Sequence, residues 1–141
     1  MKKVLYKMLL VSLFTGITLY AQSQTRAAVN SLYDQLQRCA DATGHTDQCN
    51  RRLYDGLDSL LNVAYKNLFS KLSSAKRAAL QREERDWIKS RDLNFKRFEK
   101  EVNTHDGTSV PGTEIYDTFL YEKKNEFVRK RVLQLISRLG G

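Results

Sequence analysis

The sequence predicts an all-α protein, a small antiparallel bundle of about four helices with one disulfide. The chain of 141 residues contains a single proline and is rich in Leu, Lys, Arg, Gln and Ala, which favour helices. Apolar residues recur at three- and four-residue steps in four segments, and no strand-like alternation occurs. Because short joins connect most of these segments, neighbouring helices should run antiparallel in one domain.

The first two helices are expected at residues 26–41 and 47–72. Each carries one apolar face, as expected for a helix packed against a core. In the first segment this face is formed by Val29, Leu32, Tyr33, Leu36 and Cys39. In the second it is formed by Cys49, Leu53, Leu57, Leu60, Leu61, Ala64, Leu68 and Leu72. Thr46 stands where its hydroxyl can cap the first turn of the second helix.

The third helix is expected at about residues 75–102, and charged residues interrupt its apolar stripe. The stripe comprises Leu80, Glu84, Trp87, Arg91, Phe95, Phe98 and Val102. Glu84 and Arg91 are two turns apart, too far to pair directly, so each should find a partner on another helix. Three interpretations stay open: an ion network that fixes helix register, the rim of a ligand groove, or ordinary surface charges. Trp87, between the two charges, is expected in the core.

A loop at residues 103–113 precedes the fourth helix, expected at 114–138. The loop is rich in turn formers and contains His105, Asp106 and Ser109. The inner face of the fourth helix is expected to comprise Leu120, Phe127, Val128, Leu135 and Leu139.

Residues 1–23 resemble a cleaved export signal. Three lysines precede an apolar run from Met8 to Tyr20, and Ala21-Gln22-Ser23 fits a signal-peptidase site, with cleavage after Ala21 as the alternative. The run of 13 residues is short against the roughly 20 that span a membrane, so stable membrane insertion is not expected. The domain would then occupy residues 24–141, in the periplasm or outside the cell. Removing three lysines lowers the formal net charge from +8 to +5, and nucleic acid is not an expected partner there.

Cys39 and Cys49 are the two cysteines of the chain, and both follow the export signal. In an oxidising compartment such a pair most simply forms a structural disulfide between two helices. A redox-active pair is the alternative, but the nine intervening residues differ from the compact Cys-x-x-Cys arrangement.

Three pieces of sequence then occur in order. Cys39-Ala-Asp-Ala-Thr leads to Cys49, and Asp58 precedes Leu61-Asn62-x-x-Tyr65-x-x-Leu68-x-x-x-Leu72. Leu80 then precedes Glu84-Arg85-x-Trp87-x-x-x-Arg91-Asp92. Together they resemble the LprI-like lysozyme-inhibitor domain, a family of exported bacterial helical domains, over about residues 39–135. The resemblance implies a structural role for Asn62, Tyr65, Glu84, Arg85, Trp87, Arg91 and Asp92.

The chain departs from this family pattern at the second pair of cysteines. Phe95 stands at the third cysteine position, and Phe119 or Tyr121 lies near the fourth. An aromatic contact is expected to replace the second disulfide. Arg129 and Arg131 are both candidates for the arginine of the later Thr-x-x-Arg segment of the family.

No catalytic group, metal site or cofactor is expected. His45 and His105 both fall in turns without the paired histidine spacing of a helical metal site. Carboxylates and cations alternate along residues 82–92, as on a solvated, salt-bridged helix face. We therefore expect a binding protein rather than an enzyme.

Two partners remain open. The fourth helix is basic, and Lys123, Lys124, Lys130 and Arg131 are candidates for binding an anionic component of the cell envelope. The alternative partner is a lysozyme, blocked by the 103–113 loop through His105, Asp106 or Ser109. Charge favours the first, because many lysozymes are themselves basic.

Overall fold

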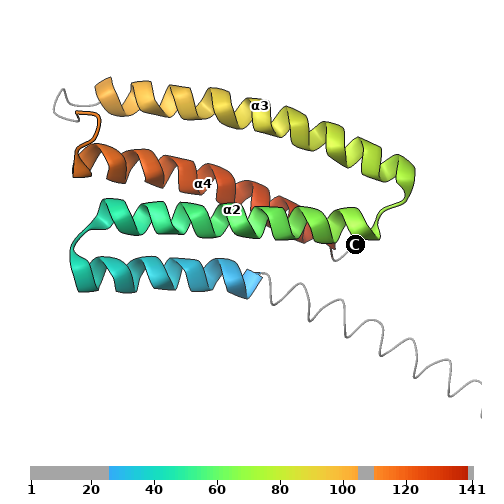
Figure 1. Ribbon diagram of the computed structural model, residues 1–141, viewed down its shortest axis with the longest axis horizontal. Helices are drawn as coiled ribbons and strands as arrows, with labels where there is room; N and C mark the ends of the chain where they lie inside the picture. The colour runs from blue at the N-terminus through green and yellow to red at the C-terminus, as the bar shows by residue number, and fades with distance from the viewer. Residues whose placement is uncertain (1–25, 105–109, 140–141) are drawn as a thin grey trace, which may run out of the picture.

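The computed structural model describes residues 26–104 and 110–139, and this part of the chain is an all-α bundle of four helices (Figure 1). The first helix covers residues 26–43. It is followed by α2 (Thr46–Lys71), α3 (Ser74–Thr104) and α4 (Glu114–Leu139). No strand occurs in the described ranges, so the predicted fold class is confirmed. None of these helices is long and apolar enough to cross a membrane.

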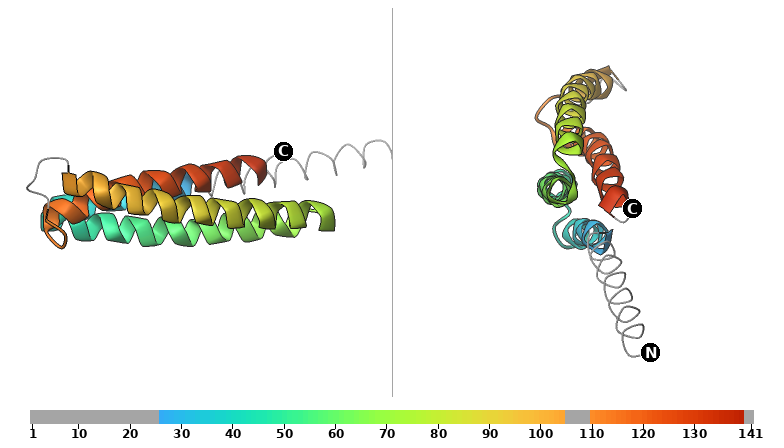
Figure 2. Two further views of the ribbon diagram at one scale, coloured as in Figure 1. Left: turned by 90° about the horizontal axis from the view of Figure 1, so that it is seen from above. Right: turned by 90° about the vertical axis from the view of Figure 1, so that its right-hand side faces the viewer.

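The helices α2 and α4 form the centre of the bundle. They run side by side in the same direction, with the first helix packed on α2 and α3 on the far side of α4 (Figures 1 and 2). The α2–α4 contact is much more extensive than the α3–α4 contact. The position of α3 therefore depends on the side chains that join it to α4.

One large apolar cluster fills the space between the first helix, α2, α3 and α4. Leu57 of α2 and Val128, Val132, Leu135 and Ile136 of α4 are fully buried there. Gly56 allows the first helix to approach α2 closely, because an added Cβ would lie 2.6 Å from a methyl group of Leu32. A second, smaller cluster joins the end of α3 to the start of α4. It comprises Phe98, Val102, Tyr116 and Leu120.

The helix boundaries differ from the prediction by one or two residues, and one cap was wrong. Thr46 is the first residue of α2 and does not cap it; His45 stands at the cap position and makes no side-chain capping bond. The reason is that the first helix continues to residue 43, so that Gly44, with φ of 69°, makes the turn almost alone. The third helix extends to Thr104, two residues further than expected.

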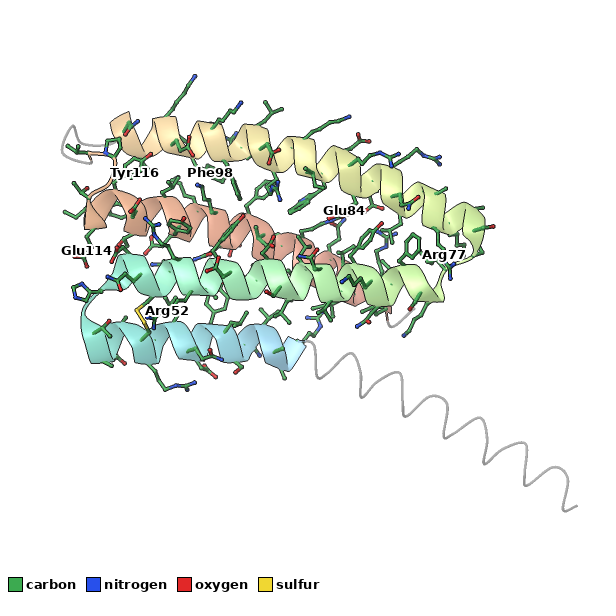
Figure 3. The ribbon with its side chains drawn as sticks, viewed as in Figure 1. Arg52, Arg77, Glu84, Phe98, Glu114 and Tyr116 are labelled. Carbon is green, nitrogen blue, oxygen red and sulfur yellow. A yellow bond between two sulfur atoms is a disulfide. The ribbon has the colours of Figure 1, made fainter. Side chains whose placement is uncertain are left out.

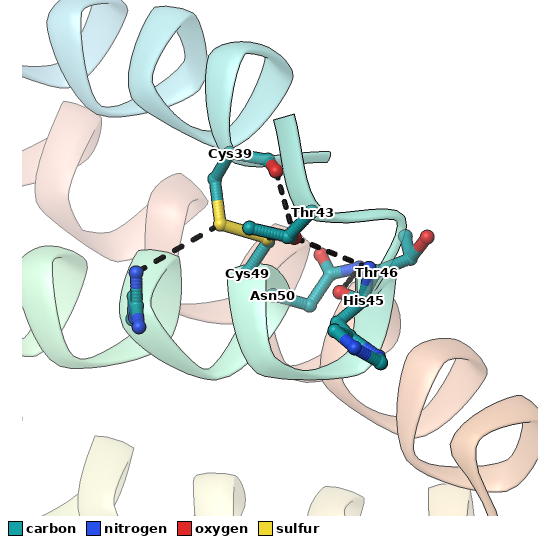
Figure 4. The surroundings of a disulfide bond; sticks show 7 residues. Cys39, Thr43, His45, Thr46, Cys49 and Asn50 are labelled. Carbon is teal, nitrogen blue, oxygen red and sulfur yellow. Dashed lines mark hydrogen bonds between the residues drawn. A yellow bond between two sulfur atoms is a disulfide. The ribbon is translucent and has the colours of Figure 1, made fainter. Parts of the chain in front are cut away.

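The predicted disulfide between Cys39 and Cys49 is confirmed. It joins the end of the first helix to the first turn of α2, with the two Cα atoms 5.8 Å apart (Figure 4). Thr43 supports this turn: its hydroxyl donates to the Cys39 carbonyl at 2.9 Å and accepts from the His45 amide at 3.2 Å. The disulfide therefore fixes one end of the bundle.

Aromatic rings occupy the place of the missing second disulfide. Tyr54 of α2 makes edge contacts with Phe95 and with Tyr121, at 6.0 and 5.8 Å between ring centroids. The Lys124 ammonium lies over both of the latter rings. Tyr121, rather than the exposed Phe119, is the residue that takes part. Phe95 and Tyr121 are thus connected through the ring of Tyr54, which the sequence did not predict.

Removing the disulfide should lower the free energy of unfolding by about 2–3 kcal/mol, because the cross-link restricts a short loop of the unfolded chain. The test is urea denaturation of the oxidised protein, the reduced protein and a Cys39→Ser/Cys49→Ser variant. The two forms without the bond should agree with each other. Two alkylatable thiols in the native, oxidised protein would contradict the assignment.

Candidate functional site

The charged centre of the bundle is Arg131, which projects from α4 into the interface with α3. Its side chain is only 3% exposed. Its guanidinium donates to Glu83 at 2.7 Å and to Glu84 at 2.6 Å, both on α3. Figure 3 shows the position of Glu84 on α3. Arg138, whose side chain is partly exposed, also pairs with Glu83 at 2.8 Å. The partner on another helix that the sequence predicted for Glu84 is therefore present.

This network sets the protonation of Glu83. Partial burial alone would raise the pKa of the Glu83 carboxyl, but the hydrogen bonds from Arg131 and Arg138 outweigh it and lower that pKa. Glu84 accepts two hydrogen bonds from the same guanidinium, at 3.2 Å from Nε and 2.6 Å from Nη2 of Arg131. The group therefore links α3 to α4 through three charged side chains and the partly exposed Arg138.

Arg91 behaves differently from the prediction. Its ion partner is Asp92, the next residue on the same helix, at 2.8 Å, and not a residue of another helix. The guanidinium lies over the rings of Trp87 and Phe95, at 5.7 and 6.0 Å from their centroids. Aromatic faces can stabilise a guanidinium in place of a second carboxylate, which explains the difference.

Trp87 lies partly buried at the centre of the α3–α4 interface. Its ring stacks with Phe127 of α4, with centroids 6.0 Å apart, and packs against the main core cluster. Arg131 lies 5.7 Å from the same ring. Trp87 therefore connects the apolar core to the buried ion pairs.

Four of the motif residues meet in a shallow groove of about 280 Å³ between α2 and α3. The lining residues are Leu61, Asn62, Tyr65, Gln81, Glu84, Arg85 and Ile88. Asn62 uses its amide within α2, donating to the Asp58 carbonyl at 2.9 Å. The groove thus brings together the family motifs of two helices, and no polar side chain in it is deeply buried.

The basic residues predicted to bind an anionic surface do not form a free cationic stripe. Lys123 pairs with Glu101 at 3.1 Å, Lys124 with Glu99 at 3.6 Å, and Lys130 with Glu126 at 3.6 Å. Arg131 is buried and satisfied by two carboxylates, so it is not available to an external partner. Counting charges along the sequence missed these pairs because their acidic partners come mostly from α3.

The other predicted binding residues, His105, Asp106 and Ser109, lie outside the described residues. The segment after them is described: Thr113 donates from its amide and its hydroxyl to the Val110 carbonyl and so closes a turn before α4. Val110, Ile115 and Phe119 are 58%, 57% and 44% exposed. The sequence pointed to Phe119 only as a residue near the fourth cysteine position, and did not predict that these three apolar side chains are exposed.

A second feature missed by the sequence analysis is a pocket of about 270 Å³ between the first helix, α2 and α4. Two asparagines, Asn50 and Asn125, lie at its base and are each 2% exposed. The pocket is also lined by Tyr33, Leu36, Gln37, Ala40, Thr46, Leu53, Glu122 and Glu126. The sequence did carry a signal, since Asn125 interrupts an apolar stripe of the last helix at a three-residue step from Val128.

His45, Asp47 and Glu114 bring possible metal-binding atoms within 4.8 Å of one another at the starts of α2 and α4. These side chains are exposed or half-buried. Carboxylates at helix N-termini are favoured by the helix dipole without any ion, so we assign no metal to this group.

Replacing Arg131 by glutamine should lower the free energy of unfolding by about 3 kcal/mol, since it leaves Glu84 without its buried partner. Arg131→Lys should recover only part of this loss, because an ammonium cannot bridge two carboxylates as the guanidinium does. Chemical denaturation measures both. The matched control is Arg129→Gln on the same helix, whose more exposed ion pair should contribute less than about 1 kcal/mol. Equal losses in the two glutamine variants would contradict the role of Arg131.

The free energy of unfolding should also fall with pH below about 4.5, the ordinary pKa of a glutamate. A carboxyl whose pKa is lower in the folded state stabilises the fold above its unfolded pKa, and this stabilisation is lost as the pH falls through its folded pKa. Denaturation at several pH values should show a shallower loss in Glu83→Gln than in wild type. The exposed carboxyl variant Asp55→Asn should keep the wild-type slope, and an unchanged slope in Glu83→Gln would be the contrary result.

A family model described as "Lysozyme inhibitor LprI" matches residues 37–135, from the end of the first helix to the last turns of α4. No match was found among curated proteins or among solved structures. Because the family match covers the disulfide, the Arg131 network and the motif groove in one stretch of more than half the chain, the protein belongs to the LprI family of lysozyme inhibitors.

Proposed function

We propose that this protein is exported and inhibits a lysozyme by binding to it. The observation that carries the proposal is the family match over residues 37–135. The pattern of residues 1–23 supports export, and the disulfide suits an oxidising compartment. The ion pairs of Lys123, Lys124 and Lys130 weigh against an anionic envelope component, because these cations are already neutralised within the molecule.

The contact surface in this proposal is the α3–α4 end of the bundle. Val110, Ile115 and Phe119 expose apolar side chains next to the predicted binding loop. Ile115 and Phe119 are one helical turn apart and so share one face of α4. A loop flanked by an apolar patch is suited to cover the mouth of an enzyme cleft.

Charge at this end also suits a basic enzyme. The first two turns and a half of α4 contain Glu114, Asp117 and Glu122 and no basic residue. Asp117 is already paired with Arg51 at 2.5 Å, which leaves Glu114 and Glu122 as the carboxylates of this stretch without an ion pair to a described residue, and these two can attract a cationic partner. Local complementarity of this kind accelerates association with a cationic partner.

The test is a lysis assay in which c-type and g-type lysozymes digest a peptidoglycan suspension with increasing amounts of the oxidised protein. We expect saturable inhibition of at least one lysozyme. An Ile115→Ser/Phe119→Ser variant should inhibit about tenfold less well, because truncating a central apolar contact removes more than 1 kcal/mol of binding energy.

The matched control is Val63→Ser/Leu93→Ser. It removes two side chains that are 48% and 69% exposed but lie on α2 and α3, away from the proposed surface. It should inhibit like wild type. An absence of inhibition with every lysozyme would refute the proposed function. An equal loss of inhibition in both double variants would refute the proposed contact surface.

A further inference from the structure

We propose that the pocket between the first helix and α4 binds a cationic side chain, a lysine or arginine, of the partner protein. That this partner is the lysozyme rests on the proposed function above. Three features of the pocket suit it to a cation: a buried amide with an unused acceptor, a rim of acceptors and carboxylates, and a position beside the apolar patch.

The first feature is the pair Asn50 and Asn125 at the base of the pocket. The Asn50 side-chain amide donates to the Thr46 carbonyl at 3.1 Å. The Asn125 amide donates to both oxygens of Asn50, the carbonyl at 3.1 Å and the side-chain oxygen at 3.2 Å. Because two acceptors face the Asn125 nitrogen, turning this amide around would place oxygen against oxygen, so its orientation is fixed.

The fixed orientation leaves Asn125 Oδ1 buried without a hydrogen-bond partner. Among the described residues, no other buried side-chain oxygen or nitrogen lacks a hydrogen-bond partner. An unmet acceptor in the interior costs free energy that a hydrogen-bond donor would recover. Because Asn125 is one of the residues that line the pocket, an occupant that reaches this oxygen through a small shift of the side chain would supply the missing donor.

The second feature is the chemistry of the other lining groups. Gln37 uses its amide nitrogen to donate to Asp41 at 2.9 Å, which leaves its oxygen as an acceptor. Glu122 forms no ion pair with any described residue, and the Glu126 carboxylate stands beside it on the next turn of α4. A lysine ammonium offers three donors and no acceptor, and an arginine offers five donors, so both match a pocket of acceptors.

The rim already holds one cation of the chain itself. The Arg129 guanidinium lies over the Tyr33 ring, 5.4 Å from its centroid, and pairs with Glu126 at 3.3 Å. The aromatic face of Tyr33 and the Glu126 carboxylate, which also pairs with Lys130 at 3.6 Å, thus already stabilise positive charge at the pocket. Glu122 lacks such a partner among the described residues and is the carboxylate left for an external cation.

The third feature is the continuity of the pocket with the proposed contact surface. Ile115, Phe119, Glu122 and Glu126 follow one another at steps of four, three and four, so they form one stripe along α4. The stripe passes from exposed apolar residues to carboxylates at the pocket rim. A partner covering the apolar part would bring a neighbouring cationic side chain over Glu122.

The pocket can be tested with n-butylammonium chloride as a lysine mimic and 1-butanol as its uncharged match. Both are titrated into the isotopically labelled, oxidised full-length protein, and the side-chain amide signals of Asn125 and Gln37 are followed by NMR. We expect saturable shifts of both signals with n-butylammonium and none with 1-butanol at equal ionic strength. Glu122→Gln should weaken this binding about two- to fivefold, as expected for one partly exposed ion pair. Asp55→Asn, which removes the same charge outside the pocket, should not.

The same two variants connect the pocket to the partner. In the lysis assay, Glu122→Gln should weaken inhibition about two- to fivefold and Asp55→Asn should leave it unchanged. Inhibition that is intact in Glu122→Gln, or butylammonium titrations that leave the Asn125 signal in place, would overturn the inference while the inhibitor function stands. A protein that inhibits no lysozyme would refute the function, and the NMR titration would still decide whether the pocket binds cations.

Discussion

The ion pairs of Arg131 are the interaction on which the arrangement of the helices depends. The helix α3 makes its main backbone approach to α4, and that approach is much less extensive than the one between α2 and α4. Arg131 reaches across this interface to Glu83 and Glu84 on successive positions of α3. Because the guanidinium is planar and its donors are fixed in direction, it holds the two helices in one axial register. Trp87 and Phe127 then fill the space beside it. The family motif around Glu84 and Trp87 therefore supplies the α3 side chains that pack against α4.

A disulfide and a group of aromatic rings both stabilise the half of the bundle that carries the α3–α4 connection. At the end that carries the α3–α4 connection, the disulfide closes the turn between the first helix and α2. Further along, rings from three helices, Tyr54, Phe95 and Tyr121, meet where the family pattern has a second disulfide. These aromatic contacts distribute the stabilisation over several partners.

The helices themselves could be predicted because apolar periodicity is a local property of the sequence, and their bounds were correct to within two residues. The sequence predicted that Glu84 pairs with a residue of another helix, but it could not identify Arg131 as that residue. Pairing across helices depends on how the helices pack. Arg131 stands three residues after Val128 and four before Leu135, and this spacing places it on the inner face of α4. Counting Arg131 with the other basic residues of the helix led to its assignment as a surface residue. Arg91 was assigned wrongly because the periodicity of one helix does not show that two aromatic faces lie within reach. The pocket around Asn125 required three helices to be placed, and no single stretch of sequence contains it.

The direction of the chain through the bundle has a consequence for how the molecule can be attached to a surface. The first helix runs toward the disulfide end, and α4 runs away from it, so both ends of the described chain point away from the α3–α4 connection (Figures 1 and 2). Each of α2 and α4 has 26 residues and extends about 39 Å at 1.5 Å per residue. Coupling the protein to a bead, a sensor chip or a membrane through Leu139 therefore leaves the disulfide end oriented outward, separated from the support by the length of the bundle.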